Sequence, residues 1–238
     1  MKITEYHENG YTIANKLVEP TFLDEIVRTI KAPFYKQIER FGYSSMIDLY
    51  EEMPDIFMNC AKHAQWNLQL HHLGVMLGYK VGAFMQREPL INICTRPVVY
   101  FNNLKTAKKA VNHTTPAHAD SISMKGSEDA VVVWVPLIEM SEEHGFLEIA
   151  PKSHILDHSI KKFEDGFGNV DEELFTFEPI KVKKGDVLIF NSNLVHRSGK
   201  LQNDKVTRWS AHFRFNNMYD ERFITNGYPH PYEYKNIT

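Results

Sequence analysis

Apolar residues in the first third of the chain recur at the spacing of helices. Residues 19–33 predict a helix with Thr21 as its N-cap and Pro33 as its end. Residues 44–53 predict a short helix, and residues 55–77 predict a longer one. The buried faces are expected to contain Leu23, Ile26, Val27 and Ile30 in the first helix, and Phe57, Ala61, Ala64 and Leu68 in the long helix.

Beyond residue 88 the apolar residues come in short runs rich in β-branched and aromatic types, separated by turn residues. Runs of this length and spacing are typical of strands in an antiparallel sandwich or barrel. Residues 104–117 and 151–173 are polar and lack a clear period, so we expect loops there. The segments expected to contain strands are 89–103, 130–140, 146–151, 175–182, 187–191 and 206–217, with a further short strand within 8–18.

These two patterns together predict an α+β fold whose core is mainly β. A helical part over residues 1–88 is expected to pack on a β-sandwich over residues 89–216, followed by a C-terminal tail over 217–238. A chain of 238 residues suits one domain with a substantial extension, so we interpret residues 1–238 as a single functional unit.

Composition and charge exclude several classes of function. The formal net charge of −3 gives no electrostatic reason to expect nucleic-acid binding. The two cysteines, Cys60 and Cys94, form no metal-binding spacing and are interpreted as core residues in a reducing compartment. The chain shows neither a signal peptide nor an apolar run long enough for a membrane helix, so we expect a cytoplasmic protein without a membrane partner.

Two potential metal ligands, His118 and Asp120, lie one residue apart in the sequence HAD. In an extended strand both side chains would point to the same side. His-x-Asp is common by chance, so the hypothesis depends on a third ligand. His196 is the candidate, because it follows the strand predicted at 187–191. The adjacent His71 and His72 point about 100° apart on a helix and are expected to be structural.

The segment after His196 returns as a strand with strict alternation, which we interpret as a hairpin. Arg208 and Ser210 therefore point the same way, with Val206, His212 and Arg214 on the same face. His212 and Arg214 are expected towards the closed end of a barrel or paired with an acid, with entry into the pocket as the alternative. The opposite face contains Thr207, Trp209, Ala211, Phe213 and Phe215, which should pack on a second layer.

The residue types of His118, Asp120 and His196, together with Arg208, predict a particular chemistry. Two neutral imidazoles and one carboxylate on one face of Fe(II) leave three coordination positions open. A bidentate 2-oxo acid such as 2-oxoglutarate can fill two of these positions, and O2 the third. The distal carboxylate of 2-oxoglutarate then requires a cation and a hydroxyl, which Arg208 and Ser210 would supply.

Several motifs, in the same order, resemble the phytanoyl-CoA dioxygenase (PhyH) family of Fe(II)- and 2-oxoglutarate-dependent oxygenases. The resemblance is clear over residues 116–215 and fainter over 9–30. It implies a double-stranded β-helix, the jelly roll of cupins, with helices packed on it. The matching segments read HAD, AVVVWVPLIEMSEEHGFLEIAPKSH, KKGDVLIFNSNLVHRSG and TRWSAHFRF, with NGYTIANKLVEPTFLDEI near the N-terminus.

The resemblance implies a role for each matching residue. His118, Asp120 and His196 would bind iron, and Arg208 would bind the 2-oxoglutarate tail. Ser198 matches a serine of the cosubstrate pocket. The remaining residues implied or expected near the cosubstrate are Trp134, Ser210, and Tyr100 or Asn102 on a lining strand. Departures from the family pattern fall in turns: Phe146 for Pro, His144 for Asn and Lys152 for Gly.

The function implied is the hydroxylation of a small molecule, with release of succinate and CO2. Related halogenases lack the carboxylate that Asp120 provides, which favours hydroxylation; desaturation and ring formation stay open. The alternatives are a cupin-type isomerase or hydrolase, or a jelly roll that only binds a small molecule. Arg208 argues against a simple cupin. The polar loops fit a polar metabolite or a sugar at least as well as an acyl-CoA, and the oligomeric state is left open.

Overall fold

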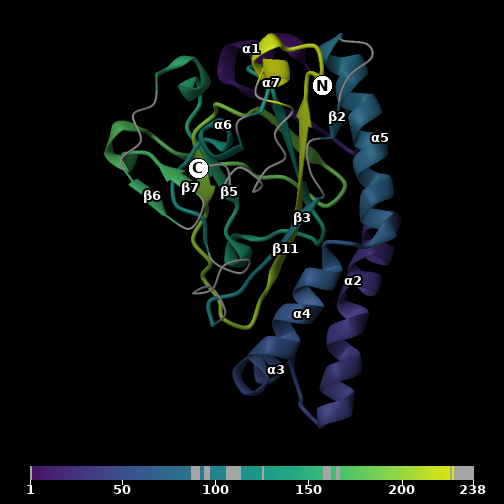
Figure 1. Cartoon of the computed structure of the whole chain (residues 1–238). Coiled ribbons are helices and arrows are strands. Elements are labelled where there is room, and N and C mark those ends of the chain that lie inside the picture. Colours follow the sequence, from purple (N-terminus) through teal and green to yellow (C-terminus); the bar gives the residue numbers. More distant parts are fainter. Residues whose placement is uncertain are drawn as a thin grey trace.

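The computed structural model describes residues 2–86, 92–93, 97–105, 114–124, 126–157, 162–164, 167–225 and 227. Cys94, most of the predicted loop at 104–117 and the end of the predicted tail lie outside these residues. Helices α2, α4 and α5 cover one side of a sheet that contains β3 and β11 (Figure 1). This arrangement agrees with a helical part that packs on a β core.

The helices occur mainly in the N-terminal part of the chain. They are α1 (Ile3–Asn9), α2 (Pro20–Phe41), α3 (Met46–Glu52), α4 (Pro54–Ala64), α5 (Leu68–Met85), α6 (Asp120–Met124) and α7 (Glu221–Thr225), with 3-10 turns at Glu142–His144, Ser153–Ile155 and Glu172–Leu174. Within the described part of the chain, none is both long and apolar enough to span a bilayer.

The first predicted helix differs from expectation at both ends. Glu19, not Thr21, is the N-cap residue of α2, and it makes no side-chain cap. The helix also continues through Pro33 to Phe41. A proline inside a helix removes one backbone hydrogen bond and costs about 3 kcal/mol. Phe34, the next residue, is fully buried among aromatic rings, and this burial offsets the cost.

The long helix predicted over 55–77 is divided into α4 and α5 by a break at residues 65–67. Gln65 leaves the helix to pair with strand β3, where its Oε1 accepts from Val99 N at 2.6 Å and its Nε2 donates to Val99 O at 3.1 Å. Asn67 then caps α5 by accepting from Leu70 N at 3.0 Å. Leu68 consequently lies 82% exposed instead of on the predicted buried face.

A six-stranded antiparallel sheet, the major sheet, forms the centre of the molecule. Its order is β1-β9-β4-β11-β2, and β3 also pairs with β11. The N-terminal strand β1 thus joins the β core by pairing with β9. The strands are β1 (Tyr11–Ala14), β2 (Asn92–Ile93), β3 (Val98–Asn102), β4 (Val131–Pro136), β9 (Val187–Asn191) and β11 (Arg208–Asn216).

A smaller sheet, the minor sheet, faces the major sheet and has the order β10-β5-β8. A β6–β7 hairpin lies within the segment 151–173, which was predicted to be a loop. The predicted hairpin between His196 and the following strand is wrong, because β10 and β11 belong to different sheets. The strands are β5 (Leu147–Ile149), β6 (Lys162–Glu164), β7 (Phe167–Asn169), β8 (Glu178–Pro179) and β10 (His196–Ser198).

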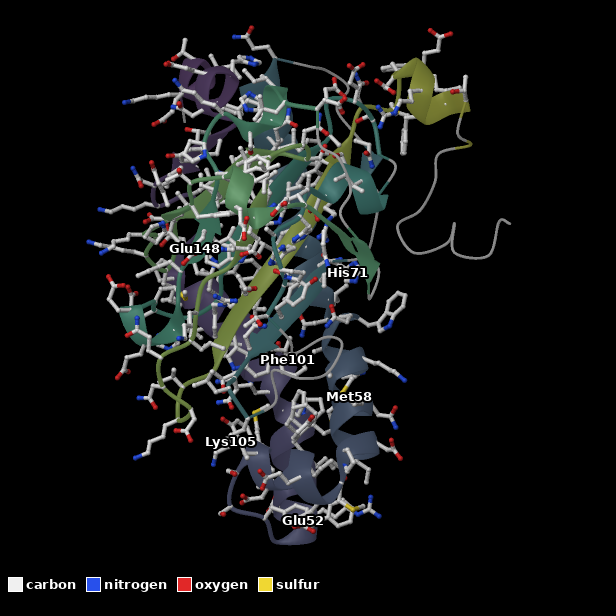
Figure 2. The ribbon with its side chains drawn as sticks, turned by 90° about the vertical axis from the view of Figure 1, so that its left-hand side faces the viewer. Glu52, Met58, His71, Phe101, Lys105 and Glu148 are labelled. Carbon is white, nitrogen blue, oxygen red and sulfur yellow. The ribbon has the colours of Figure 1, made fainter. Side chains whose placement is uncertain are left out.

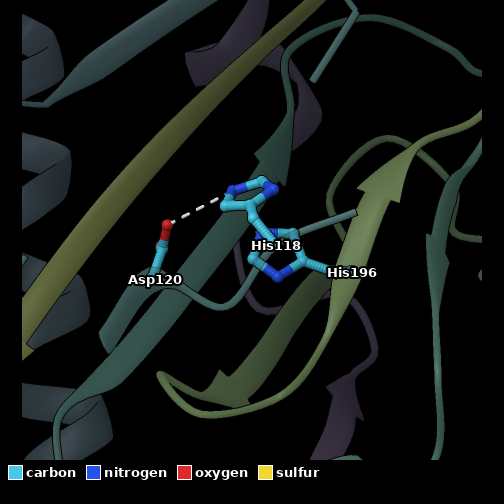
Figure 3. A group of neighbouring side chains, drawn as sticks. All are labelled: His118, Asp120 and His196. Carbon is cyan, nitrogen blue, oxygen red and sulfur yellow. Dashed lines mark ion pairs between the residues drawn. The ribbon is translucent and has the colours of Figure 1, made fainter. Parts of the chain in front are cut away.

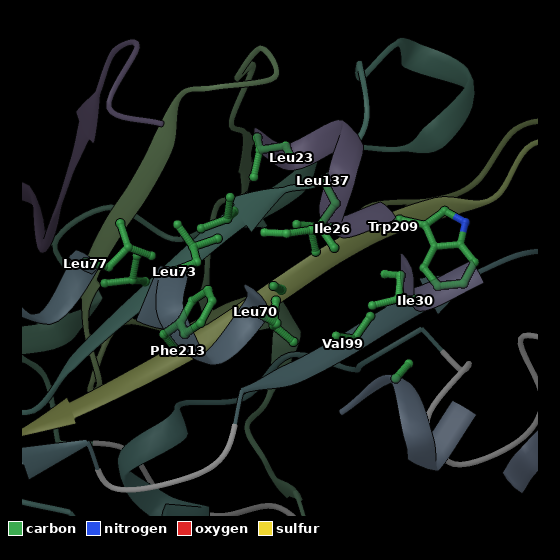
Figure 4. Close-up of a cluster of buried hydrophobic side chains, with 14 of the residues drawn as sticks. Leu23, Ile26, Ile30, Leu70, Leu73, Leu77, Val99, Leu137, Trp209 and Phe213 are labelled. Atoms are coloured by element: carbon green, nitrogen blue, oxygen red, sulfur yellow. The ribbon is translucent and has the colours of Figure 1, made fainter. Parts of the chain in front are cut away.

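The major sheet is buried on both faces. One face packs on the helices in a single cluster, in which Trp209 and Phe213 of β11 meet Ile30 of α2 and Leu73 of α5 (Figure 4). The other face packs on the minor sheet through residues such as Trp134. Figure 2 shows Phe101 of β3 and Met58 of α4 where sheet and helices meet. Cys60 is a buried free thiol in the helix-side cluster, as predicted.

We predict that Phe34→Ala lowers the free energy of unfolding by about 3–5 kcal/mol, as full truncations of buried Phe do. Phe34 is 0% exposed, and its ring centroid lies 5.1 Å from the ring centroid of Phe57 and 6.2 Å from that of Trp209. Tyr35→Ala is the matched control, because Tyr35 on the same helix turn is 55% exposed. Urea unfolding followed by circular dichroism measures both; equal losses for the two variants would contradict this account of α2.

Candidate active site

The HAD segment is not the extended strand that the sequence predicted. His118 forms an isolated bridge with His196, and Asp120 begins the short helix α6. The bridge is reciprocal: His118 N donates to His196 O, and His196 N donates to His118 O, each at 3.0 Å. The helical turn, instead of strand alternation, therefore directs the Asp120 carboxylate towards the imidazoles.

The structure brings the three predicted ligands together in a buried group. One ligand atom from each of His118, Asp120 and His196 lies within 4.8 Å of the others, and this group is the one metal-binding cluster found among the described residues. His118 Nε2 lies 3.6 Å from Asp120 Oδ1 (Figure 3). The two imidazole centroids are 4.3 Å apart. The predicted convergence is thus present although the predicted local structure is not.

Backbone carbonyls fix the orientation of both imidazoles. His118 Nδ1 donates to Pro116 O at 2.7 Å, and His196 Nδ1 donates to Leu194 O at 3.0 Å. A carbonyl oxygen only accepts, so each ring holds a proton on Nδ1 and directs Nε2 towards the group. This is the orientation that a metal-binding imidazole requires.

The electrostatics of the group favour the charge states of metal ligands. Burial, together with the neighbouring His118, lowers the pKa of His196 to about 3, so the His196 ring is neutral at pH 7. Burial of Asp120 opposes its ionisation, but the charge of Arg214 and the contact with His118 hold the pKa of its carboxyl well below the usual range. Neutral imidazole together with an ionised carboxylate is a donor set that fits Fe(II).

Arg208 lies on the inner face of β11, as the alternation predicted, and is 3% exposed. Its Nε and Nη2 donate to Asn102 Oδ1 at 3.2 and 3.1 Å, and its Nη1 donates to Gly145 O at 2.6 Å. Burial lowers its pKa to about 10, so the guanidinium stays charged at neutral pH. Both acceptors are neutral, and no carboxylate of the described residues pairs with this cation.

The remaining residues predicted near the cosubstrate occupy different positions around the inner space. Ser210 is buried and pairs across the strands with Tyr100, while Asn102 holds Arg208. Trp134 belongs to the cluster between the two sheets. Ser198 hydrogen-bonds Thr115, whose N donates to Ser198 Oγ at 3.0 Å.

Ser198 also lines a pocket of about 340 Å³ beside strand β10. Most of its lining is polar or charged. The pocket residues include Thr115, Glu148, Glu172, Arg197 and Lys200.

The sequence placed His212 and Arg214 on the same face of β11 as Arg208 and predicted that they lie towards the closed end of the barrel or pair with an acid. Arg214 forms a bidentate ion pair with Asp120, at 2.9 and 3.2 Å. This confirms the expectation of an acidic partner, although that partner is the candidate metal carboxylate itself. His212 lies between Arg208 and Arg214 along β11, and its ring centroid is 4.7 Å from the ring centroid of Tyr100. Its Nδ1 has no hydrogen-bond partner in the described part of the chain. Burial lowers the pKa of His212 well below its usual range.

The histidine pair on α5 has the structural role that the sequence predicted. His71 Nε2 hydrogen-bonds Gln65 O at 3.2 Å, and the ring stacks on Trp66. The ring of His72 contacts Phe22 of α2 edge to face.

Comparison with known proteins agrees with the geometry. The family model for phytanoyl-CoA dioxygenase (PhyH) matches residues 6–209. A curated relative, 1-deoxypentalenic acid 11-beta-hydroxylase of Streptomyces arenae, is 22% identical over 215 residues, which is 81% of this chain and 71% of the relative.

Solved structures show the same fold at low sequence identity. AviO1 from Streptomyces viridochromogenes Tue57 has a TM-score of 0.58 and 15% identity, covering 92% of this chain and 94% of its own. The epimerase SnoN from nogalamycin biosynthesis, in complex with Fe3+, alpha ketoglutarate and nogalamycin RO, has a TM-score of 0.56 and 16% identity, covering 90% of this chain and 81% of its own. The jelly-roll prediction is confirmed, and the chain belongs to the phytanoyl-CoA dioxygenase (PhyH) family of iron- and 2-oxoglutarate-dependent oxygenases.

Proposed function

We propose that this oxygenase binds Fe(II) through His118, Asp120 and His196, and binds the distal carboxylate of 2-oxoglutarate through Arg208. The observation that carries the proposal is the buried guanidinium of Arg208, which has neutral acceptors and no carboxylate partner among the described residues. A buried cation is costly unless an anion pairs with it, so this position is suited to an anionic ligand. Iron and 2-oxoglutarate together supply the oxidation of an unactivated C–H bond, with release of succinate and CO2.

The residues of the chain then have separable roles. The Nε2 atoms of His118 and His196 point into the group because backbone carbonyls hold their Nδ1 protons. Asn102 and the carbonyl of Gly145 hold the Arg208 guanidinium in one orientation. Burial of all four proposed binding residues keeps water away from the reacting centre, which strengthens the electrostatic contacts there.

We propose hydroxylation of a small polar molecule as the reaction. Asp120 supports hydroxylation over halogenation, because related halogenases lack this carboxylate. The fold itself does not fix the outcome, because SnoN of similar fold is an epimerase. The polar composition of the segments 104–117 and 151–173 supports a polar substrate. We also propose a cytoplasmic location without a nucleic-acid or membrane partner, on the basis of the composition and the net charge of −3.

The cupin-type isomerase, hydrolase or binding protein is the second candidate. Such a protein would use the same three metal-binding residues, but it would bind no anionic molecule that could pair with Arg208. Binding of 2-oxoglutarate therefore separates the two candidates.

We predict that Asp120→Ala and His196→Ala reduce succinate formation from 2-oxoglutarate by more than about 100-fold, since even outer partners of metal ligands contribute up to about 100-fold. The assay supplies Fe(II), O2 and a panel of polar small molecules. His63→Ala is the control, because His63 is exposed on α4 far along the chain from the site. Full succinate formation by either ligand variant would refute the proposed metal site.

We predict that Arg208→Met weakens 2-oxoglutarate binding at least about 30-fold, because loss of one partner from a buried charge pair costs about 2–5 kcal/mol. Titration of the Fe(II) protein without O2, followed by the visible absorption band of the metal–cosubstrate complex, measures the affinity. Metal affinity should not change. Arg28→Met, which removes an exposed arginine, is the control. Unchanged 2-oxoglutarate affinity in Arg208→Met would refute the proposed role of Arg208, whereas absence of the absorption band in the unaltered protein would favour the cupin-type alternative.

A further inference from the structure

The most unusual contact beside the proposed metal site joins Arg214 to Asp120. The guanidinium presents two donors to the two carboxylate oxygens: Nε donates to Oδ2 at 2.9 Å, and Nη2 donates to Oδ1 at 3.2 Å. Arg214 is 4% exposed and Asp120 is 1% exposed. The pair is therefore shielded from solvent and has the parallel, fork-like geometry that fixes a carboxylate plane.

The fork restricts how the carboxylate can meet a metal ion. A carboxylate that chelates one ion uses the lone pairs of both oxygens on the side away from its carbon. Arg214 already occupies this side, with one N–H on each oxygen. Oδ1 is also the oxygen that lies 3.6 Å from His118 Nε2. It keeps a second lone pair for the metal, so the geometry allows one Asp120 oxygen to bind and excludes chelation through both.

A purely structural explanation of the pair is weaker. Buried ion pairs add little stability compared with apolar residues of similar volume, because desolvation cancels most of the Coulomb attraction. A role in orienting Asp120 accounts for both the fork geometry and the position next to the candidate metal group.

We propose that Arg214 is a positioning residue for the metal carboxylate: it holds Asp120 so that a single oxygen binds the ion. The proposal rests on the metal site proposed above. Binding through one oxygen leaves three positions of an octahedral ion open, which is the number that 2-oxoglutarate and O2 together require. Arg208 and Arg214, six residues apart on one strand, then act at opposite ends of the site: one on the cosubstrate tail, the other on the metal carboxylate.

The test is a double-mutant cycle on metal affinity, measured by calorimetry with Ni(II) and the full-length protein. Ni(II) binds imidazole more strongly than Fe(II), so His118 and His196 alone retain a measurable affinity. Arg214→Met should weaken Ni(II) binding about 10–100-fold in the otherwise unchanged protein. In the Asp120→Asn background, where there is no carboxylate to position, the same substitution should change the affinity less than about twofold.

The remaining variants separate positioning from folding. Arg214→Lys keeps the charge but not the fork, and should recover part of the lost affinity; it replaces Arg214→Met in the cycle if the latter does not fold by circular dichroism. Lys184→Met, which removes the ion pair with Asp24 on α2, is the matched control and should leave Ni(II) affinity unchanged. Equal losses in both backgrounds, or wild-type affinity in Arg214→Met, would overturn the positioning role. Absence of Ni(II) binding in the unaltered protein would instead overturn the proposed metal site.

Discussion

The site depends on the burial of β11 on both faces. A strand in the middle of a sheet directs alternate side chains to opposite sides, and β11 has two different environments on those sides. Trp209 and Phe213 pack on the helices and fix the strand in place. Arg208 and Arg214 face the minor sheet, where apolar partners would be expected. The helix-side packing therefore stabilises a strand whose inner face carries charges that weaken the core.

The second requirement is the reciprocal backbone bridge between His118 and His196. Two hydrogen bonds of 3.0 Å join segments that are far apart in the sequence and hold the two imidazoles with centroids 4.3 Å apart. His118 also forms an isolated bridge with Asn169 of β7, so the β6–β7 hairpin supports the HAD segment from its other side. The two histidines are thus positioned by backbone pairing at the minor sheet, whereas α6 positions Asp120 and the major sheet provides the arginines.

Each charged side chain of the candidate site has defined neighbours in the interior of the protein. Asp120 is paired with Arg214, and His118 and the neutral His196 complete the candidate metal group. Arg208 is held by neutral acceptors and keeps its charge. A dianionic cosubstrate would offset the charge of a divalent ion and give Arg208 a carboxylate partner, which is the arrangement expected of a site prepared in advance for its ligands.

The periodicity of apolar residues along the chain was sufficient to predict the central strands and the direction of their side chains. Strand periodicity identified β4, β9 and β11 and gave the correct inner face of β11, with Arg208 and Ser210 on one side. The ordered motifs around HAD, His196 and Arg208 were sufficient to recognise the family.

Tertiary structure decided what local patterns could not. Helix α2 continues past Pro33 because Phe34 is buried against Phe57 and Trp209, residues remote in sequence. The α4–α5 break depends on Gln65 pairing with Val99 of β3. Asp120 meets His118 through a helical turn, and it meets Arg214 only because the major sheet lies beside α6. The sequence by itself determined which residue types face inward; long-range packing determined which of them meet, because a local period carries no information about partners far along the chain.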